Sequence, residues 1–291
     1  MAGEAGQART VLLATEKAFA AEAVSKIETV LSEAKYTLVK LENYKSKDEL
    51  LAAAENVDAM IIRSDIVDSA VVEKAAKLKI VVRAGAGYDN IDLKACEEKS
   101  VVAMNTPGQN ANAVAELVFA MMLTSARNNF DGTSGFEVAG RSIAFYGFGA
   151  VARAVHKLAL GFGMKTFAYD PYIPKEAIAA QGATPVDSPA DLFDYQYVTL
   201  HVPLTPETKD SINKELLMKM PKGATLINTA RPEVVHEAEM LEVLSARPDF
   251  CYLSDVPPKN AEEVKALVGD KFTKRVIFTK KKMGAQTLEA N

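Results

Sequence analysis

Short apolar runs alternate with helical patterns along almost the whole chain, and this alternation limits the possible folds most strongly. In the first part, strands are expected at 10–14, 36–41, 59–63, 79–83 and 101–105, and a helix at 19–34. Repeated strand–helix units predict a parallel sheet with helices on both faces. The first part is therefore expected to form a flavodoxin-like unit of about five strands.

A second alternating series follows a long helical stretch at 112–127 that is apolar on more than one face. Such a helix is buried on several sides, as a domain connector, a dimer contact or both. Strands are then expected at 142–148, 165–169, 197–202, 225–229, 251–255 and 276–279. This series predicts a doubly wound dinucleotide fold, so the fold class is α/β with two doubly wound domains.

Length and composition exclude several classes of protein. The 291 residues suit two domains, and a net charge of −4 without a long basic run is unlike a nucleic-acid binder. No apolar run reaches the roughly 18 residues of a membrane span. Cys96 and Cys251 suggest no disulfide framework, which favours a reducing, cytosolic setting. No metal site is expected.

A glycine-rich turn at 147–152 reads G-x-G-x-x-A and stands between an expected strand and an expected helix. In a dinucleotide fold the first glycine permits the tight turn and the second admits the pyrophosphate. The helix N-terminus then offers N–H groups and positive potential to the phosphates. The cofactor-binding candidates in this turn are Gly147, Phe148, Gly149, Ala150 and Val151.

Asp170 ends the next expected strand, about 20 residues after the second glycine, where an acidic residue accepts the ribose hydroxyls of NAD. A turn aspartate before Pro171 is the alternative interpretation. No arginine follows Asp170, so a 2′-phosphate would meet a carboxylate without a compensating cation. NAD is therefore predicted rather than NADP.

In the first part, Arg63 and Arg83 each end an expected strand. Parallel strands place their carboxyl ends on one side, where ligands bind. The loop Gly85, Ala86 and Gly87 adds backbone N–H groups that form a nest for an anion. Two arginines and a nest suit a substrate with a carboxylate and a phosphate, although either arginine could instead be a surface residue.

Several motifs together carry a family resemblance: the segments 83–92, 104–108, 112–117, 201–205 and 227–231. In these segments the chain resembles the D-2-hydroxyacid dehydrogenase family, and within it the phosphoglycerate dehydrogenases, from about Thr10 to the end. The resemblance implies a substrate-binding domain at 1–105, completed by 280–291, and an NAD-binding Rossmann domain at 106–279. It also implies an active site in the cleft between them and a homodimer through the NAD-binding domain.

The resemblance also assigns roles to single residues. Arg231 matches the arginine that binds the substrate carboxylate, although Pro232 follows it where the family usually has glycine. Arg63, Ser64 and Arg83 match positions near the substrate phosphate. Asp255 matches an acidic position near the nicotinamide carboxamide. The further cofactor-binding candidates are Asn112, His201, Val202, Pro203, Thr208, Thr229, Ala230 and Gly284.

The family's catalytic histidine and its assisting glutamate are both missing. No carboxylate lies at 256–260, and Lys282 stands two residues before Gly284, where the histidine would be. Either the chain is inactive or Lys282 is the acid/base, as in a subgroup of similar phosphoglycerate dehydrogenases. The alternative without a function is that these lysines form a solvated basic loop. The three histidines do not replace the missing one: His156 is expected to be structural, His201 to line the cofactor site, and His236 to cap a helix.

The function implied by the resemblance is NAD-dependent oxidation of 3-phosphoglycerate in serine biosynthesis. Glyoxylate or hydroxypyruvate reduction is a close alternative. The third hypothesis is a non-catalytic, NAD-sensing scaffold of the same fold, which the missing histidine and glutamate favour. Arg231, Arg63 and Arg83 count against the scaffold, because a scaffold need not keep an anionic-substrate pocket.

Overall fold

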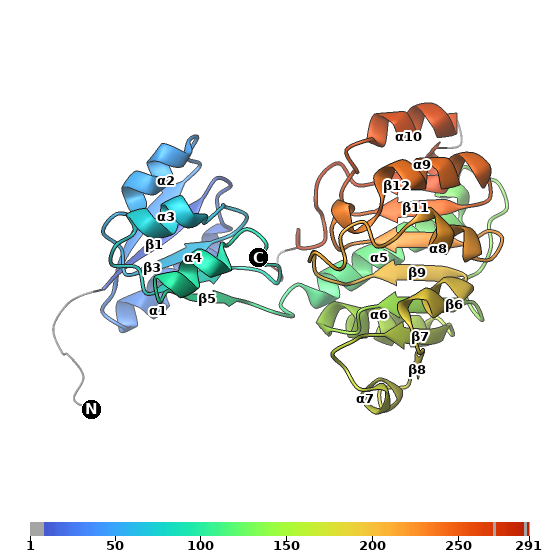
Figure 1. The fold of residues 1–291 in the computed structure, drawn as a ribbon, viewed down its shortest axis with the longest axis horizontal. Coiled ribbons are helices and arrows are strands. Elements are labelled where there is room, and N and C mark those ends of the chain that lie inside the picture. The colour runs from blue at the N-terminus through green and yellow to red at the C-terminus, as the bar shows by residue number, and fades with distance from the viewer. Residues whose placement is uncertain (1–8, 270–271, 288–289, 291) are drawn as a thin grey trace. The chain divides into compact units, whose positions relative to one another are not determined.

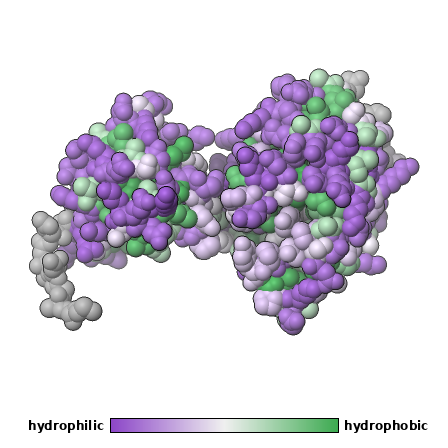
Figure 2. Space-filling view, viewed as in Figure 1, coloured by the Kyte–Doolittle hydropathy of each residue, from purple (hydrophilic) through white to green (hydrophobic). Residues whose placement is uncertain are grey.

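The chain divides into two compact units, one up to Gln109 and the other from Asn110 to Ala290 (Figure 1). The structure is a computed structural model that describes residues 9–269, 272–287 and 290. Figure 2 shows hydrophilic residues over most of the visible face of each unit, with apolar residues in small groups. Within the described ranges, no helix is both long and apolar enough to cross a membrane.

The first unit is a five-stranded sheet in the order β2-β1-β3-β4-β5, and every pairing in it is parallel. This is the flavodoxin-like order predicted from the alternating pattern. Its elements are β1 (Thr10–Thr15), α1 (Ala21–Glu33), β2 (Thr37–Glu42), α2 (Lys47–Ala54), β3 (Ala59–Ile62), α3 (Ser69–Lys74), β4 (Ile80–Arg83), α4 (Leu93–Glu98) and β5 (Val102–Asn105).

Three helices of this unit begin at residues whose side chains cap them. Ser46 forms a capping box with Glu49 at the start of α2, and the carboxylates of Asp68 and Asp92 accept N–H groups in the first turns of α3 and α4. Each cap satisfies a donor that the helix cannot pair internally. The caps fix where each helix begins, and therefore where each preceding strand must end.

The second unit is a seven-stranded parallel sheet in the order β12-β11-β10-β9-β6-β7-β8. Six of its strands were expected. The seventh, β8 (Thr184–Pro185), is a two-residue edge strand, too short to leave a periodic pattern in the sequence. The predicted doubly wound dinucleotide fold is confirmed, with one more strand than expected.

The elements of this unit cover both faces of its sheet (Figure 1). They are α5 (Ala111–Ala126), η1 (Asn128–Phe130), β6 (Ser142–Tyr146), α6 (Ala150–Gly161), β7 (Lys165–Tyr169), α7 (Lys175–Ala179), β8, η2 (Pro189–Asp194), β9 (Tyr197–Leu200), α8 (Lys214–Lys219), β10 (Thr225–Asn228), η3 (Pro232–Val234), α9 (Glu237–Ala246), β11 (Cys251–Ser254), α10 (Ala261–Val268), α11 (Phe272–Arg275) and β12 (Val276–Phe278).

Helix α5 buries residues on several sides, as its sequence predicted, and it does so inside its own unit. Val118 and Met122 are fully buried, and Phe119 stacks on Phe162 with ring centroids 4.8 Å apart. The helix contacts α6, β11 and β12. Packing within the chain accounts for this apolar composition, and the dimer contact stays a prediction.

The amino edge of this sheet is held by two arginines. Arg247 donates to the carbonyl oxygens of Leu217, Met220 and Pro221 and pairs with Asp249 at 2.7 Å. Arg275 donates to the carbonyl oxygens of Leu244, Arg247 and Phe250. Hydrogen bonds from a charged group contribute about 1.5–3 kcal/mol each, so these two side chains tie together the starts of β10, β11 and β12.

The segment after β12 differs from the sequence expectation, which assigned 280–291 to the first domain. The structure groups residues 280–287 and 290 with the second unit, and residues 288, 289 and 291 lie outside the described residues. The backbone N–H groups of Met283 and Gly284 donate to the Asp255 carboxylate at the end of β11. These bonds attach the described part of the segment to the second unit.

Candidate active site

Five predicted site residues lie at one edge of the second sheet. All its strands are parallel, so the residues that follow their carboxyl ends share that edge, which is where open α/β sheets bind ligands. The residues that directly follow β6, β7, β9, β10 and β11 are Gly147, Asp170, His201, Thr229 and Asp255.

Gly147 makes the turn after β6 possible. Its φ is +84°, and a Cβ there would lie 2.8 Å from the carbonyl oxygen of His201. No other residue fits, because the turn packs backbone against backbone where β9 ends. The first glycine of the motif therefore brings the cofactor turn and the loop after β9 together.

Gly149 stands at the N-cap of the 12-residue helix α6, and a Cβ added there would meet nothing within 4 Å. The backbone at the helix N-terminus is therefore open on the side where a Cβ of residue 149 would stand. That geometry fits a pyrophosphate, since the first N–H groups of the helix and its dipole favour an anion. Phe148 and Ala152 are fully buried, so their side chains hold the turn rather than line the site.

Asp170 has a second task that the sequence did not indicate. One carboxylate oxygen accepts the N–H of Phe148 at 2.8 Å, and the other accepts the N–H of Tyr172 at 2.9 Å. The residue expected to bind the ribose therefore also holds the glycine-rich turn. A carboxylate oxygen has two lone pairs, so both tasks are compatible.

We expect replacement of Asp170 by alanine to abolish the preference for NAD over NADP. The loss of a charge-assisted hydrogen bond changes affinity by roughly ten- to a hundredfold, and removal of the negative charge relieves repulsion of a 2′-phosphate. The measurement is kcat/KM with each cofactor. Asp170→Asn is the matched variant, because it keeps the shape and removes the charge. Equal efficiency with both cofactors in the unchanged protein would refute the assignment.

His201 lies beside this turn and between two threonines. Its ring nitrogens are 3.0 Å from the Thr199 hydroxyl and 3.4 Å from the Thr229 hydroxyl. Desolvation lowers the pKa of the His201 imidazole to about 3, so the ring stays neutral at physiological pH. A neutral ring can line a cofactor site, but it cannot supply the missing acid.

The other two histidines have the structural positions expected of them. His156 is buried in α6 with one ring nitrogen 2.8 Å from the carbonyl oxygen of Gln181. His236 is the N-cap of α9, and its ring accepts the N–H of Glu239 at 3.4 Å. Neither side chain belongs to the carboxyl edge described above.

Arg231 is half-buried and sits on a loop that Asn228 organises. The Asn228 amide is buried, accepts the N–H of Ala230 at 3.0 Å and donates to the carbonyl oxygen of Arg231 at 2.9 Å. Sequence reasoning missed Asn228; a polar residue closing an otherwise apolar strand was the available signal. Pro232 starts η3, a helix position that suits proline. The departure from glycine at Pro232 is thus accommodated.

Asp255 is 2% exposed, and its carboxylate is occupied by protein donors. One oxygen accepts the N–H of Met283 at 2.6 Å and the other that of Gly284 at 3.0 Å. Burial raises the pKa of Asp255, while these two N–H groups and the charge of Lys282 oppose the rise. The Lys282 side chain itself is exposed. The expected contact of Asp255 with the nicotinamide stays a prediction.

In the first unit, Arg63 and Arg83 lie at the carboxyl ends of the neighbouring strands β3 and β4. The Arg83 Nε donates to the carbonyl oxygen of Arg63 at 3.0 Å. A Cβ on Gly85 would lie 1.4 Å from Arg83 Nη1, so the guanidinium rests directly on the glycine loop. The Arg83 guanidinium is therefore brought onto the glycine loop, whereas the Arg63 guanidinium lies over the Phe19 ring, 5.3 Å from its centroid. Ser64, next to Arg63, is exposed.

A buried carboxylate that sequence reasoning missed supports this loop. Asp65 accepts the N–H of Arg63 at 3.1 Å, the N–H of Glu16 at 2.8 Å and the phenol of Tyr44 at 2.8 Å. Asn90 donates to the carbonyl oxygen of Arg63 at 3.2 Å. These contacts join the ends of three strands, so the position of Arg63 is fixed by residues far from it in sequence.

The remaining candidates have defined places but untested contacts. Asn112 is exposed in the first turn of α5, and Ala150 is exposed at the start of α6. The Thr208 hydroxyl donates to the carbonyl oxygen of Pro203 at 2.6 Å, which closes the loop after β9. Val202, in the same loop, is buried. Their contacts with a cofactor stay predictions.

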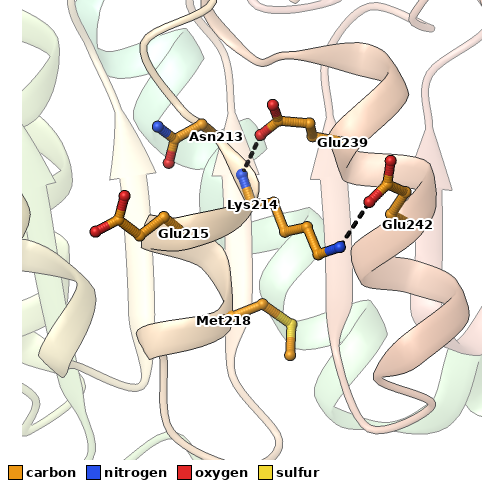
Figure 3. A pocket seen from close by; sticks show the side chains of 6 residues that line it. All are labelled: Asn213, Lys214, Glu215, Met218, Glu239 and Glu242. Carbon is orange, nitrogen blue, oxygen red and sulfur yellow. Dashed lines mark hydrogen bonds and ion pairs between the residues drawn. The ribbon is translucent and has the colours of Figure 1, made fainter.

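A separate hollow lies between α8 and α9 and contains none of the predicted site residues (Figure 3). Three of its polar residues are bonded to one another: Lys214 bonds Glu242 through its ammonium at 2.7 Å and Glu239 through its backbone N–H at 2.6 Å. Across the described residues, no group of three or more His, Cys, Asp or Glu side chains is placed to hold a metal ion. We assign no role to the hollow.

Comparison with known proteins identifies the family of the chain. Residues 111–279 match the family model described as "D-isomer specific 2-hydroxyacid dehydrogenase, NAD binding domain". A 3-phosphoglycerate dehydrogenase from Entamoeba histolytica, solved with NAD+ bound, is similar with a TM-score of 0.89 and 38% identity. That similarity covers 98% of this chain and 90% of the other.

Two relatives differ in how much of their length the chain covers. A D-3-phosphoglycerate dehydrogenase from Methanocaldococcus jannaschii is 38% identical over 68% of this chain, but the chain spans only 41% of that protein. A hydroxypyruvate reductase from Thermotoga maritima is 35% identical over 84% of this chain and 83% of its own length. The matched domain, its glycine-rich turn and these relatives show that the chain belongs to the D-isomer specific 2-hydroxyacid dehydrogenase family and carries its NAD-binding domain.

Proposed function

We propose that the protein oxidises 3-phosphoglycerate to 3-phosphohydroxypyruvate with NAD, the first step of serine biosynthesis. The observation that carries this proposal is the pair Arg63 and Arg83 at the ends of neighbouring strands, with Arg83 resting on the Gly85 loop. Two guanidinium groups from the ends of neighbouring strands, one of them on the glycine loop, suit a phosphate. Relatives named D-3-phosphoglycerate dehydrogenase are 33–38% identical, which supports the same substrate.

In this proposal two sets of arginines bind different groups of the substrate. Arg63, Ser64 and Arg83 hold the phosphate, and Arg231 holds the carboxylate with its planar guanidinium. NAD, when bound, supplies the hydride acceptor, at nicotinamide C4. The hydride leaves C2 of the substrate, and the neutral amine of Lys282 takes the proton of the C2 hydroxyl as the carbonyl forms. Arg231 stabilises negative charge that develops on that oxygen.

We expect Arg63→Ala and Arg83→Ala each to weaken the reaction with 3-phosphoglycerate by roughly ten- to a hundredfold, the cost of a charge-assisted hydrogen bond. Glycerate, which lacks the phosphate, should be affected much less. The measurement is kcat/KM for both substrates with NAD. Arg9→Ala is the matched control, because Arg9 precedes β1 at the opposite edge of the same sheet. Equal losses for both substrates would contradict phosphate binding by these arginines.

The same assay separates the other candidate functions. Reduction of glyoxylate or hydroxypyruvate is favoured by the Thermotoga maritima relative, which the chain covers over most of its length. A reductase of that kind would prefer unphosphorylated substrates and would tolerate loss of Arg63. A non-catalytic NAD sensor would bind NADH and turn over none of these acids. The homodimer and the cytosolic location stay predictions.

A further inference from the structure

The Asp255 carboxylate is paired with the backbone of the loop that carries Lys282. The N–H of Met283 donates to Oδ1 at 2.6 Å, and the N–H of Gly284 donates to Oδ2 at 3.0 Å. Each oxygen therefore accepts one N–H, and the two donors are successive residues. The carboxylate is 2% exposed, so these bonds form away from water. Charged acceptors bind N–H groups about twice as strongly as neutral ones.

Gly284 is held from two sides at this point. A Cβ on Gly284 would lie 2.8 Å from Asp255 Oδ2 and 3.0 Å from Val114 Cγ2 of α5. Only a bare backbone can come so close to the carboxylate. The glycine after the lysine loop is therefore required by the contact with Asp255, whatever else it binds.

The lysine loop, residues 280–282, is fixed at both ends. Before it, the N–H of Thr279 donates to the carbonyl oxygen of Ser254 at 3.2 Å, and the Thr279 hydroxyl lies 2.8 Å from the carbonyl oxygen of Lys281. After it, Met283 is bound to Asp255. Three residues between two fixed points leave little freedom to the backbone of Lys282.

We infer that Asp255 is a positioning residue, which sets where the Lys282 amine stands by holding the backbone at Met283 and Gly284. The inference rests on the proposed function, in which Lys282 is the base. A misplacement of about 1 Å in a catalytic group can cost a hundredfold in rate, so a short loop with two anchors serves this reaction. Desolvation, which raises the pKa of Asp255, is opposed by the same two N–H groups.

Replacement of Asp255 by asparagine tests the inference, because asparagine keeps the shape but presents its NH2 to one of the two donors. We expect kcat to fall roughly ten- to a hundredfold. The Kd for NADH should change by less than about twofold, which is less than about 0.5 kcal/mol in binding free energy. Hydrogen exchange of the Met283 and Gly284 amides should become faster. Unchanged exchange at these amides would overturn the inference.

Asp249→Asn is the matched control at the other end of β11. Its carboxylate also accepts a backbone N–H, that of Gly223 at 2.7 Å, and it pairs with Arg247. Loss of these bonds should lower the melting temperature and leave kcat and the exchange of residues 283–284 unchanged. A comparable loss of kcat in Asp249→Asn would show that the effect of Asp255 is general destabilisation, and the inference would fail.

A cofactor analogue separates positioning from direct contact with the nicotinamide. In 3-acetylpyridine adenine dinucleotide the amide NH2 is replaced by a methyl group, so it cannot donate to a carboxylate. A positioning residue predicts that Asp255→Asn slows turnover with NAD and with the analogue by the same factor. If the variant slowed only the reaction with NAD and raised the Kd for NADH, Asp255 would be a cofactor ligand instead.

Gly284→Ala keeps the question answerable if Asp255→Asn does not fold. Its Cβ would push the loop away from Asp255 without changing the carboxylate, so it should lower kcat and speed hydrogen exchange at the Met283 amide. If both variants fold, their combined effect should be smaller than the product of the single effects, since they break one contact. Full multiplicativity would contradict the inference. Normal turnover in Lys282→Met would instead reject the proposed base, whatever the exchange data showed.

Discussion

Lys282→Met is expected to fold, to bind NADH and to lose at least a hundredfold in turnover. A general base contributes roughly a hundred- to ten-thousandfold to a rate, and no histidine takes over. Desolvation lowers the pKa of His201 to about 3, which makes it a weak base, and His156 and His236 have structural partners. Steady-state kcat with 3-phosphoglycerate and NAD is the measurement, together with an NADH titration to verify cofactor binding.

Lys281→Met is the control for this change, since Lys281 is the adjacent exposed lysine on the same loop. It should keep near-normal turnover. Because only the neutral amine accepts a proton, oxidation in the unchanged protein should rise with pH, and Lys282→Met should lose that dependence. Near-normal turnover in Lys282→Met, alongside a strong effect at Arg231, would mean that another group is the base.

Arg231→Ala is expected to lower kcat/KM for 3-phosphoglycerate by roughly a hundred- to a thousandfold, the usual cost of removing a group that stabilises charge in the transition state. Arg231→Lys should restore little, because an ammonium cannot bind a carboxylate through two parallel hydrogen bonds. The half-buried loop is held by Asn228 through the backbone, so the fold should survive the loss of the side chain.

The control for Arg231 is Arg141→Ala. Arg141 directly precedes β6 at the opposite edge of the same sheet, and its guanidinium lies over the Phe136 ring. Its loss should leave kcat/KM unchanged. If Arg231→Ala raised only the Kd for NADH and left the rate at saturating cofactor intact, Arg231 would be a cofactor ligand and the proposed carboxylate contact would be wrong.

The strands and the cofactor turn were predictable because their causes are local. A buried parallel strand is a continuous apolar run in the sequence. The turn at residue 147 requires glycine, and the sequence shows that glycine directly. The strand β8 was not predicted, because two residues are too few to show a periodic pattern. The NAD-binding domain was also predictable, since its motif lies within about 20 residues of its acidic partner.

The supporting contacts were not predictable, because they join residues far apart in the chain. Asp65 bonds Glu16 and Tyr44, and Asp255 bonds residues 283 and 284, and no periodicity marks such pairs. Asp255 was recognised only as an acidic residue of the cofactor site. The sequence does not indicate the bonds that keep 283–284 with the second unit for the same reason, since they cross from β11 to the segment after β12.

The amino edge of the second sheet, here called its amino rim, serves stability, and the carboxyl edge holds the candidate site residues. This separation has a consequence for how the protein can change. Arg247 and Arg275 secure the amino rim through six hydrogen bonds to carbonyl oxygens and the ion pair of Arg247 with Asp249, and neither arginine belongs to the proposed chemistry. Heat tolerance can therefore be raised or lowered at that rim while substrate choice drifts at the other. Among related proteins, we expect substitutions that change heat stability at the amino ends of the strands. We expect substitutions that change substrate preference at the carboxyl ends of the same strands.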